Sequence, residues 1–241
     1  MHEPVEWSDE QCPSSPRFQD VYRSRSGGWL QAQTVFLGGC QLPAQWRGMP
    51  RFTVLETGFG LGLNFLATWA AWEADPQRCT ELHFVSVEAY PVSGADLLRS
   101  AQTVDTSSAA AAPGARRLED LVQELAWVWC DVQPGLQTFH LAQGRVHLTL
   151  AIGQVLPMLA QLDCTADAVY LDGFNPACNP QMWSQPTIDA VAGHCRAGTT
   201  LATYSAAAAV RTVLRNAGFV VRRRPGLPPK WHRLEARYAP A

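Results

Sequence analysis

The stretch "RFTVLETGFGLGLNFLATWAAW" at residues 51–72 decides the fold. Residues 52–57, of which Phe52, Val54 and Leu55 are apolar, predict a strand, the glycine-rich segment predicts a tight turn, and residues 62–73 predict a helix. Glycine is needed where a chain turns sharply and a ligand lies against bare backbone. The first turn of the following helix offers unpaired N–H groups to that ligand. The stretch therefore predicts the ligand-binding strand–turn–helix unit of an α/β sheet.

The glycine spacing separates two classes of cofactor. Glu56, Gly58, Gly60 and Gly62 form the pattern E-x-G-x-G-x-G. A dinucleotide fingerprint reads G-x-G-x-x-G, so the third glycine comes one residue early here. Glu88 ends the next predicted strand, where a carboxylate can accept both hydroxyls of a ribose. Together these features favour S-adenosylmethionine over NAD.

Predicted strands and helices alternate along most of the chain, which indicates an α/β fold. Such a fold has a mostly parallel sheet with helices on both faces. Residues 1–50 are interpreted as an N-terminal extension packed on the core, with a strand or hairpin, and residues 51–241 as one methyltransferase domain. A flexible insert is expected at 106–115. The remaining patterns predict strands at 81–88, 136–153 (two strands around a Gln-Gly turn), 166–172, 198–205, 219–225 and 232–239, and helices at 93–101, 116–129, 182–195 and 206–218.

A second informative segment, "DGFNPACNPQMW", spans residues 172–183 and directly follows a predicted strand. Its prolines remove backbone donors and hold the preceding residues extended, so the segment predicts a rigid loop. A proline-stiffened turn would explain it without any function. At the carboxyl end of a strand, however, Asp172 could orient a substrate amine and take or relay its proton. The pair Met182–Trp183 could line a pocket or anchor the next helix, and the anchor is favoured.

Composition narrows the class of protein. The chain of 241 residues is 47% hydrophobic and 17% charged, with a net charge of −2, so bulk attraction to nucleic acid is not indicated. It has no apolar stretch of membrane-spanning length, and its acidic start is unlike a signal peptide. The seven cysteines form no CxxC pair and the six histidines show no ligand spacing, so neither a disulfide framework nor a metal site is predicted. A cytoplasmic location is expected.

The sequence resembles the methyltransferase domain of the MnmC family, bifunctional enzymes that complete 5-methylaminomethyl-2-thiouridine at the wobble base of some tRNAs. The matching motifs are "FQDVYRS" (18–24), "VFLGG" (35–39), "ETGFGLGLNFL" (56–66), "DAVYLDGFNPACNPQMW" (167–183), "AGTTLATYSAAAAVRTVLRNAGF" (197–219) and "GLPPKWHRLEA" (226–236). The resemblance implies a Rossmann-type methyltransferase that methylates the aminomethyl group of the modified uridine. It assigns Asp172 as the catalytic acid–base.

The resemblance also implies a set of binding residues. The cofactor S-adenosyl-L-methionine is expected to contact Glu56, Gly58, Phe59, Gly60, Gly62, Asn64, Glu88, Gly153, Gln154 and Asp172. The substrate is expected to contact Phe174, Asn175, Pro176 and Lys230. The chain departs from the usual family pattern at four places: Gln154 replaces an Asp that holds the adenine amine, Cys178 replaces a Lys, Leu61 replaces a Thr, and Lys230-Trp231-His232 replaces Lys-Arg-Glu. Gln154 can still accept from that amine through its amide oxygen.

Three functions remain open from the sequence. The first is methylation of the wobble 5-aminomethyluridine of tRNA by a stand-alone enzyme without the oxidase domain, with a separate enzyme supplying the aminomethyl substrate. The second is N-methylation of a small-molecule amine, and the third is binding of S-adenosylmethionine without catalysis. A basic patch that could contact the tRNA anticodon region comprises Arg23, Arg25, Arg222, Arg223, Arg224, Lys230, Arg233 and Arg237, with Trp231 positioned to stack on a base.

Overall fold

The computed structural model describes residues 2–23, 27–104, 116–130, 132–228 and 230–240, and the insert expected at 106–115 lies outside them. Eight strands form one central sheet in the order β10-β11-β9-β8-β4-β5-β7-β6. Their bounds are β4 (Arg51–Thr57), β5 (Glu81–Glu88), β6 (Gly135–Leu141), β7 (Val146–Ile152), β8 (Ala166–Leu171), β9 (Cys195–Thr203), β10 (Phe219–Pro225) and β11 (His232–Tyr238).

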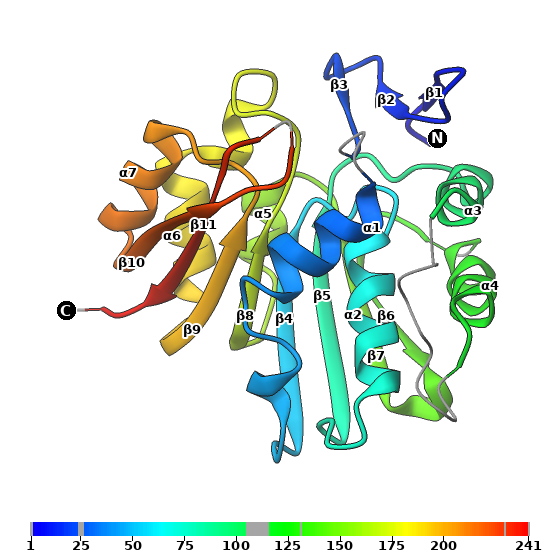
Figure 1. Ribbon diagram of the computed structural model, residues 1–241, viewed down its shortest axis with the longest axis horizontal. Helices are drawn as coiled ribbons and strands as arrows, with labels where there is room; N and C mark the ends of the chain where they lie inside the picture. The colour runs from blue at the N-terminus through cyan, green and yellow to red at the C-terminus, as the bar shows by residue number, and fades with distance from the viewer. Residues whose placement is uncertain (1, 24–26, 105–115, 131, 229, 241) are drawn as a thin grey trace.

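The five central strands, from β7 through β5, β4 and β8 to β9, pair in parallel. The strands at both edges are antiparallel: β6 pairs with β7, and β11 lies between β9 and β10. Strand β4 sits in the middle and all its residues after Arg51 are buried, because helices cover both faces of the sheet (Figure 1). A strand in this position is buried on both faces, and here the polar residues Thr53, Glu56 and Thr57 are buried as well.

Two helical layers enclose the sheet, as the α/β pattern predicts (Figure 1). One face is covered by α1 (Gly28–Gln31) with its π-helical continuation (Ala32–Leu37), α2 (Leu63–Ala74), α3 (Gly94–Gln102) and α4 (Leu118–Trp129). The other is covered by α5 (Val155–Leu159), α6 (Gln185–Gly193) and α7 (Ala208–Asn216). Short 3₁₀ turns occupy Ala44–Trp46, Ala142–Gly144 and Pro180–Trp183. The predicted mostly parallel sheet with helices on both faces is confirmed.

The N-terminal region contains a small antiparallel sheet of β1 (Glu6–Trp7), β2 (Pro13–Ser15) and β3 (Asp20–Val21). The expected hairpin is therefore present, but residues 28–37 are helical rather than extended. Their buried side chains, including Trp29 and Phe36, recur at helical spacing and enter the main core beside α2. Further along, the Trp46 indole donates to the buried Asp75 carboxylate at 3.0 Å, which ties this region to the end of α2.

Helix α5 was not predicted as a helix. It has only five residues and contains Pro157, so it carries too little periodicity to be detected from sequence. Among the described residues, no helix combines the length and apolar character needed to cross a membrane.

Candidate active site

A cavity of about 920 Å³ opens at the carboxyl ends of the central strands. It lies where strand order reverses, because β5 and β7 lie on one side of β4 and β8 and β9 on the other. Open α/β sheets bind ligands at such a reversal. The cavity is large enough for a cofactor together with part of a substrate.

The glycine turn after β4 forms one wall of this cavity. Gly58, Gly60 and Gly62 have φ values of +79°, +53° and +72°, a region that side-chain-bearing residues rarely adopt. A Cβ on Gly58 would lie 3.3 Å from the backbone of Gly173 in the loop after β8. The turn thus lets the two loops approach closely and leaves bare backbone along the cavity.

Glu88, at the end of β5, presents its carboxylate to the cavity. The backbone N–H of Gly60 donates to one oxygen at 2.9 Å and that of Tyr90 donates to the other at 2.7 Å. Burial raises the pKa of Glu88, although these two hydrogen bonds partly oppose that effect. The side chain is thereby fixed where it could accept hydroxyl groups of a ribose.

Asn64 connects two acidic side chains beneath the cavity. Its amide nitrogen donates to Glu56 at 2.9 Å and to Asp172 at 2.8 Å. Glu56 is 1% exposed and also accepts from the Ser86 hydroxyl at 2.7 Å. Burial raises the pKa of Glu56 well above its usual value, although the hydrogen bonds from Ser86 and Asn64 partly oppose that effect. By accepting a hydrogen bond from the Asn64 amide, Glu56 therefore helps to fix the orientation of the Asn64 side chain.

Asp172 lies at the start of the loop after β8 and lines the cavity. Besides Asn64, the N–H of Gly173 donates to its carboxylate at 2.8 Å. Burial raises the pKa of Asp172 to about 6, while these hydrogen bonds and the nearby Lys230 charge lower it. A carboxylate tuned to this range can take up or release a proton near neutral pH.

Two side-chain donors fix the loop that carries Asp172 by hydrogen bonding to backbone carbonyls of that loop. The Tyr204 hydroxyl donates to the Gly173 carbonyl at 2.7 Å, and the Trp183 indole donates to that of Phe174 at 2.9 Å. Trp183 is buried in one core cluster with Ile188 and Val191 of the following helix α6, in line with the favoured role as a helix anchor, whereas Met182 lines the cavity. Both alternatives for the Met–Trp pair are thus realised, one by each residue.

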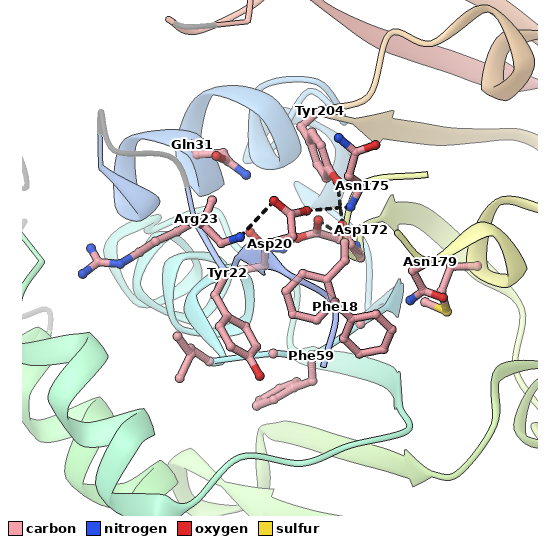
Figure 2. Close-up of a pocket in the computed structure, with 18 of the residues that line it drawn as sticks. Phe18, Asp20, Tyr22, Arg23, Gln31, Phe59, Asp172, Asn175, Asn179 and Tyr204 are labelled. Atoms are coloured by element: carbon pink, nitrogen blue, oxygen red, sulfur yellow. Dashed lines mark hydrogen bonds between the residues drawn. The ribbon is translucent and has the colours of Figure 1, made fainter. Parts of the chain in front are cut away.

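The N-terminal segment forms a roof over the cavity that was not predicted as part of the site. Phe18 stacks on Phe174 with ring centroids 4.6 Å apart, and Tyr22 meets the same ring edge-on at 5.0 Å. The Asp20 carboxylate accepts from the backbone N–H of Asn175 at 2.8 Å. Figure 2 shows these N-terminal side chains around Asp172 and Asn175. The motif "FQDVYRS" supports the family resemblance, but nothing in its composition indicates this roof.

Lys230 approaches the cavity from the C-terminal side. Its ammonium lies 3.7 Å from the centroid of the Tyr204 ring. Packing against Tyr204 removes water from part of the side chain, and this desolvation lowers the pKa of Lys230. The negative charges of Asp20 and Asp172 act in the opposite direction and partly restore it. Residues from both ends of the chain therefore meet at one opening.

Most of the residues predicted for the site line this cavity. Of the predicted cofactor contacts, the lining includes Gly58, Phe59, Gly60, Asn64, Glu88, Gly153, Gln154 and Asp172. Of the predicted substrate contacts, it includes Phe174, Asn175 and Lys230. Glu56, Gly62 and Pro176 lie outside the lining. Gln154 is exposed, and its amide nitrogen donates to the Tyr90 hydroxyl at 3.3 Å.

The predicted basic patch is partly neutralised. Glu235 pairs with Arg224 at 3.2 Å and with Arg233 at 2.8 Å. The Arg23 guanidinium donates to Thr103 at 2.6 Å and to the Gln11 carbonyl at 2.8 Å. Trp231 is 87% exposed, and Arg25 lies outside the described residues.

Comparison with known proteins gives three findings. A family model described as S-adenosyl-L-methionine-dependent methyltransferase matches residues 116–239. Proteins named tRNA 5-methylaminomethyl-2-thiouridine biosynthesis bifunctional protein MnmC match the whole chain: that of Acidovorax sp. (strain JS42) is 51% identical over 240 residues, covering 100% of this chain and 36% of that protein. The one from Cupriavidus necator is 47% identical over 233 residues, covering 97% and 34%. The resemblance to the methyltransferase domain is thereby confirmed.

The chain spans about a third of the length of these curated relatives. Among solved structures, the crystal structure of MNMC2 from Aquifex aeolicus superimposes with a TM-score of 0.72 at 18% identity, covering 98% of this chain and 70% of that one. At that identity the match supports the fold alone.

Proposed function

The chain belongs to the S-adenosyl-L-methionine-dependent methyltransferases, and from that premise we propose that it methylates the 5-aminomethyl group of the wobble (2-thio)uridine in tRNA. The observation that carries the proposal is sequence identity. About half of the residues, across the whole chain, are identical to those of proteins named for 5-methylaminomethyl-2-thiouridine biosynthesis. The cavity geometry supplies the chemistry that such a reaction needs.

The residues around the cavity fit S-adenosyl-L-methionine. The left-handed glycine turn supplies bare backbone, and the Glu88 carboxylate, held by two backbone N–H groups, suits the two hydroxyls of a ribose. Gln154 also lines the cavity, and its amide oxygen can accept from an adenine amine. We assign cofactor binding to this set, with Asn64 and Asp172 at its inner end.

Asp172 performs the proton chemistry in this proposal. The cofactor supplies an electrophilic methyl group, and the attacking nitrogen must present a lone pair. An alkyl amine is mostly protonated near neutral pH because its ordinary pKa resembles that of lysine, near 10. Ionised Asp172 attracts and orients that ammonium, then accepts or relays its proton, while Asn64 and the Gly173 N–H hold the carboxylate in place.

The opening of the cavity suits a flipped-out nucleobase. Phe174 and Tyr204 offer aromatic surfaces, and Lys230 adds a positive charge beside them. The exposed Trp231 adjoins Lys230 and could stack on a neighbouring base. In this proposal the reaction takes place in the cytoplasm, and a separate activity supplies the aminomethyl group.

The test uses tRNA from a strain that lacks the corresponding methyltransferase. The purified chain is incubated with this tRNA and S-adenosyl-L-methionine, and the nucleosides are analysed by mass spectrometry. We expect 5-aminomethyl-(2-thio)uridine to gain one methyl group, and tRNA from the undeleted strain to gain none. Unchanged tRNA in the presence of a folded, cofactor-binding chain would contradict the proposal.

Methylation of a small-molecule amine is the second candidate, and Cys178 favours it. This residue is exposed in the loop after β8, where the family usually carries a Lys suited to a phosphate. The same assay with 5-aminomethyluridine as a free nucleoside, and with simple primary amines, separates the candidates. Turnover of these compounds at rates equal to tRNA would favour the small-molecule reaction.

A further inference from the structure

Four ionisable side chains gather on three neighbouring strands, at the sheet edge opposite to the cavity. His83 of β5 pairs in register with His147 of β7, which in turn pairs with His140 of β6. Paired residues point to the same face of a sheet, so the three imidazoles form a row. Glu81 stands two residues before His83 and therefore on that face as well. These strand ends lie at the bottom of Figure 1.

The side chains of this cluster contact one another directly. The rings of His83 and His147 stack with centroids 4.3 Å apart, and the Nε2 atom of His83 lies 3.3 Å from the Glu81 carboxylate. One ligand atom from each of Glu81, His83 and His147 lies within 4.8 Å of the other two. Small side-chain rotations would bring the three atoms to the separation that a single metal ion requires.

The hydrogen bonding of His147 leaves one nitrogen without a partner. Its Nδ1 atom lies 2.9 Å from Nδ1 of His140, so one of these nitrogens donates to the other. The Nε2 atom of His147 is buried from solvent and has no hydrogen-bond partner among the described residues. If Nδ1 of His147 is the donor, Nε2 carries an unused lone pair. A metal-bound histidine has this arrangement, with its other ring nitrogen donating to an acceptor.

We propose that Glu81, His83 and His147 bind a divalent transition-metal ion of the Zn²⁺ class, and that His140 orients His147 through their Nδ1–Nδ1 hydrogen bond. Two imidazoles and one carboxylate form a ligand set that suits zinc and its neighbours rather than Mg²⁺ or Ca²⁺, which take oxygen ligands. Solvent can complete the coordination, because Glu81 is partly exposed.

Arg51 opposes cation binding at this position. Its guanidinium lies 3.3 Å from the Glu81 carboxylate, but both side chains are substantially exposed, 61% and 39%. An exposed ion pair of this kind is weak, so a metal ion can displace it. Removing the Arg51 charge should therefore strengthen metal binding. The test thus includes one variant that should bind the metal more tightly, in contrast to the histidine variants, which should bind it more weakly.

The site is structural in this proposal. His83 precedes Glu88 by five residues on the same strand, which places the two side chains roughly 16 Å apart. A bound ion would crosslink β5 to β7 and, through His140, hold the edge strand β6. Its expected effect is on thermal stability, with cofactor binding unchanged.

The experiment titrates the full chain, freed of metal with a chelator, with ZnCl₂ in a calorimeter. We expect one equivalent to bind with micromolar or tighter affinity and to raise the melting temperature. His83→Gln and His147→Gln should each weaken binding at least tenfold, and Arg51→Gln should tighten it several-fold. The matched control is His2→Gln, which changes an exposed histidine outside the cluster.

The variants are first shown to fold by their normal binding of S-adenosyl-L-methionine. Because Arg51→Gln removes no ligand, its tighter binding cannot arise from misfolding. Zinc binding only at millimolar concentration, or equal affinity in the parent and both histidine variants, would overturn the proposal.

Discussion

Three carboxylic acids surround the carboxyl ends of β4, β5 and β8, and burial raises the pKa of each. The environments of Glu56, Glu88 and Asp172 nevertheless differ. Glu56 is sealed beneath Asn64, Glu88 is held by backbone N–H groups, and Asp172 has Lys230 nearby. The three residues therefore suit different tasks, namely support, ligand binding and proton transfer.

The first prediction concerns the role of Asp172 in turnover. Asp172→Asn should lower methyl transfer by about 10²–10⁴, the usual contribution of a positioned general base. Affinity for S-adenosyl-L-methionine should change only a few-fold, because the amide oxygen can still accept one of the existing hydrogen bonds. Calorimetry and a methyl-transfer assay measure the two effects separately. Near-normal turnover would remove Asp172 from the mechanism.

The same carboxyl group predicts a pH dependence of stability. Its pKa is about 6 in the folded chain and near 3.9 when unfolded, so the folded state binds more protons between those values. Stability therefore falls as pH rises from about 4 to about 6. Asp172→Asn removes this loss, and should be more stable than the parent by about 1–3 kcal/mol at pH 8 but not at pH 4. Urea denaturation at the two pH values checks this, and an equal difference at both would contradict it.

Gln154 allows a test of adenine recognition. If its amide oxygen accepts from the adenine amine, Gln154→Leu should weaken cofactor binding by about 1–2 kcal/mol. Gln154→Glu should bind as tightly as the parent or more tightly, because a carboxylate makes a stronger, charge-assisted bond of equal reach. Tyr90→Phe is the control for the existing hydrogen bond between these side chains. Equal dissociation constants for parent, Leu and Glu proteins would show that adenine is held by other groups.

At the scale of elements, the glycine turn has a tighter protein environment than its sequence indicates. A Cβ added at Gly60 would lie 3.4 Å from the Tyr22 ring of the roof. The positive φ of this residue is a second obstacle. The turn thus joins the cofactor wall to the N-terminal segment.

We predict that Gly60→Val weakens cofactor binding at least tenfold in a folded protein, because it strains the turn and displaces Tyr22. Gly48→Val is the matched control, since Gly48 also has a positive φ but nothing lies within 4 Å of its added Cβ. Calorimetric titration and circular dichroism of both variants check the prediction. If both variants bound equally well, the turn would not be the cofactor wall.

The elements that sequence identified best are those with strong local patterns. Strand β4, the turn and α2 follow from a short run rich in strand-forming residues, three glycines and a helical segment. Helix α5 is too short to show a period, and the helical residues 28–37 begin at the second of two glycines, with Gly27 as an N-cap that has no side chain. The zinc-class site was missed for another reason, because its histidines belong to three strands and only the sheet register brings them together.

At the scale of the molecule, Asp75 joins the N-terminal region to the sheet domain. It accepts hydrogen bonds from Trp46 at 3.0 Å, Arg47 at 3.1 Å and the N–H of Gln77 at 2.9 Å. Burial opposes ionisation of Asp75, but these bonds outweigh it and lower its pKa. The ionised form is therefore favoured in the folded chain.

We predict that Asp75→Asn destabilises the protein by about 1–3 kcal/mol at pH 7, because buried donors lose a charged acceptor. A lowered folded pKa contributes stability above the unfolded pKa, and that stability is lost as pH falls through the folded value. The difference between parent and variant should therefore shrink toward pH 3. Denaturation curves at both pH values test this, and a difference that persists at pH 3 would contradict it.

The sequence predicted most of the residues in the cavity wall but not the N-terminal roof over the cavity. Wall residues such as Gly58, Glu88 and Asp172 sit at strand ends, and the positions of strand ends can be read from local patterns. Phe18 and Tyr22 come from a segment with little regular structure, and their place depends on tertiary packing against Phe174.

The meeting of both chain regions over one cavity has a consequence for protein synthesis. Glu3 and Phe18 leave the ribosome long before Lys230, yet all three line the same opening. A nascent chain that has reached β9 already has every parallel strand of the sheet, but it lacks the Lys230 side of the opening. A complete opening should thus appear only after Lys230 has left the ribosome, although the parallel strands that form its floor are made earlier.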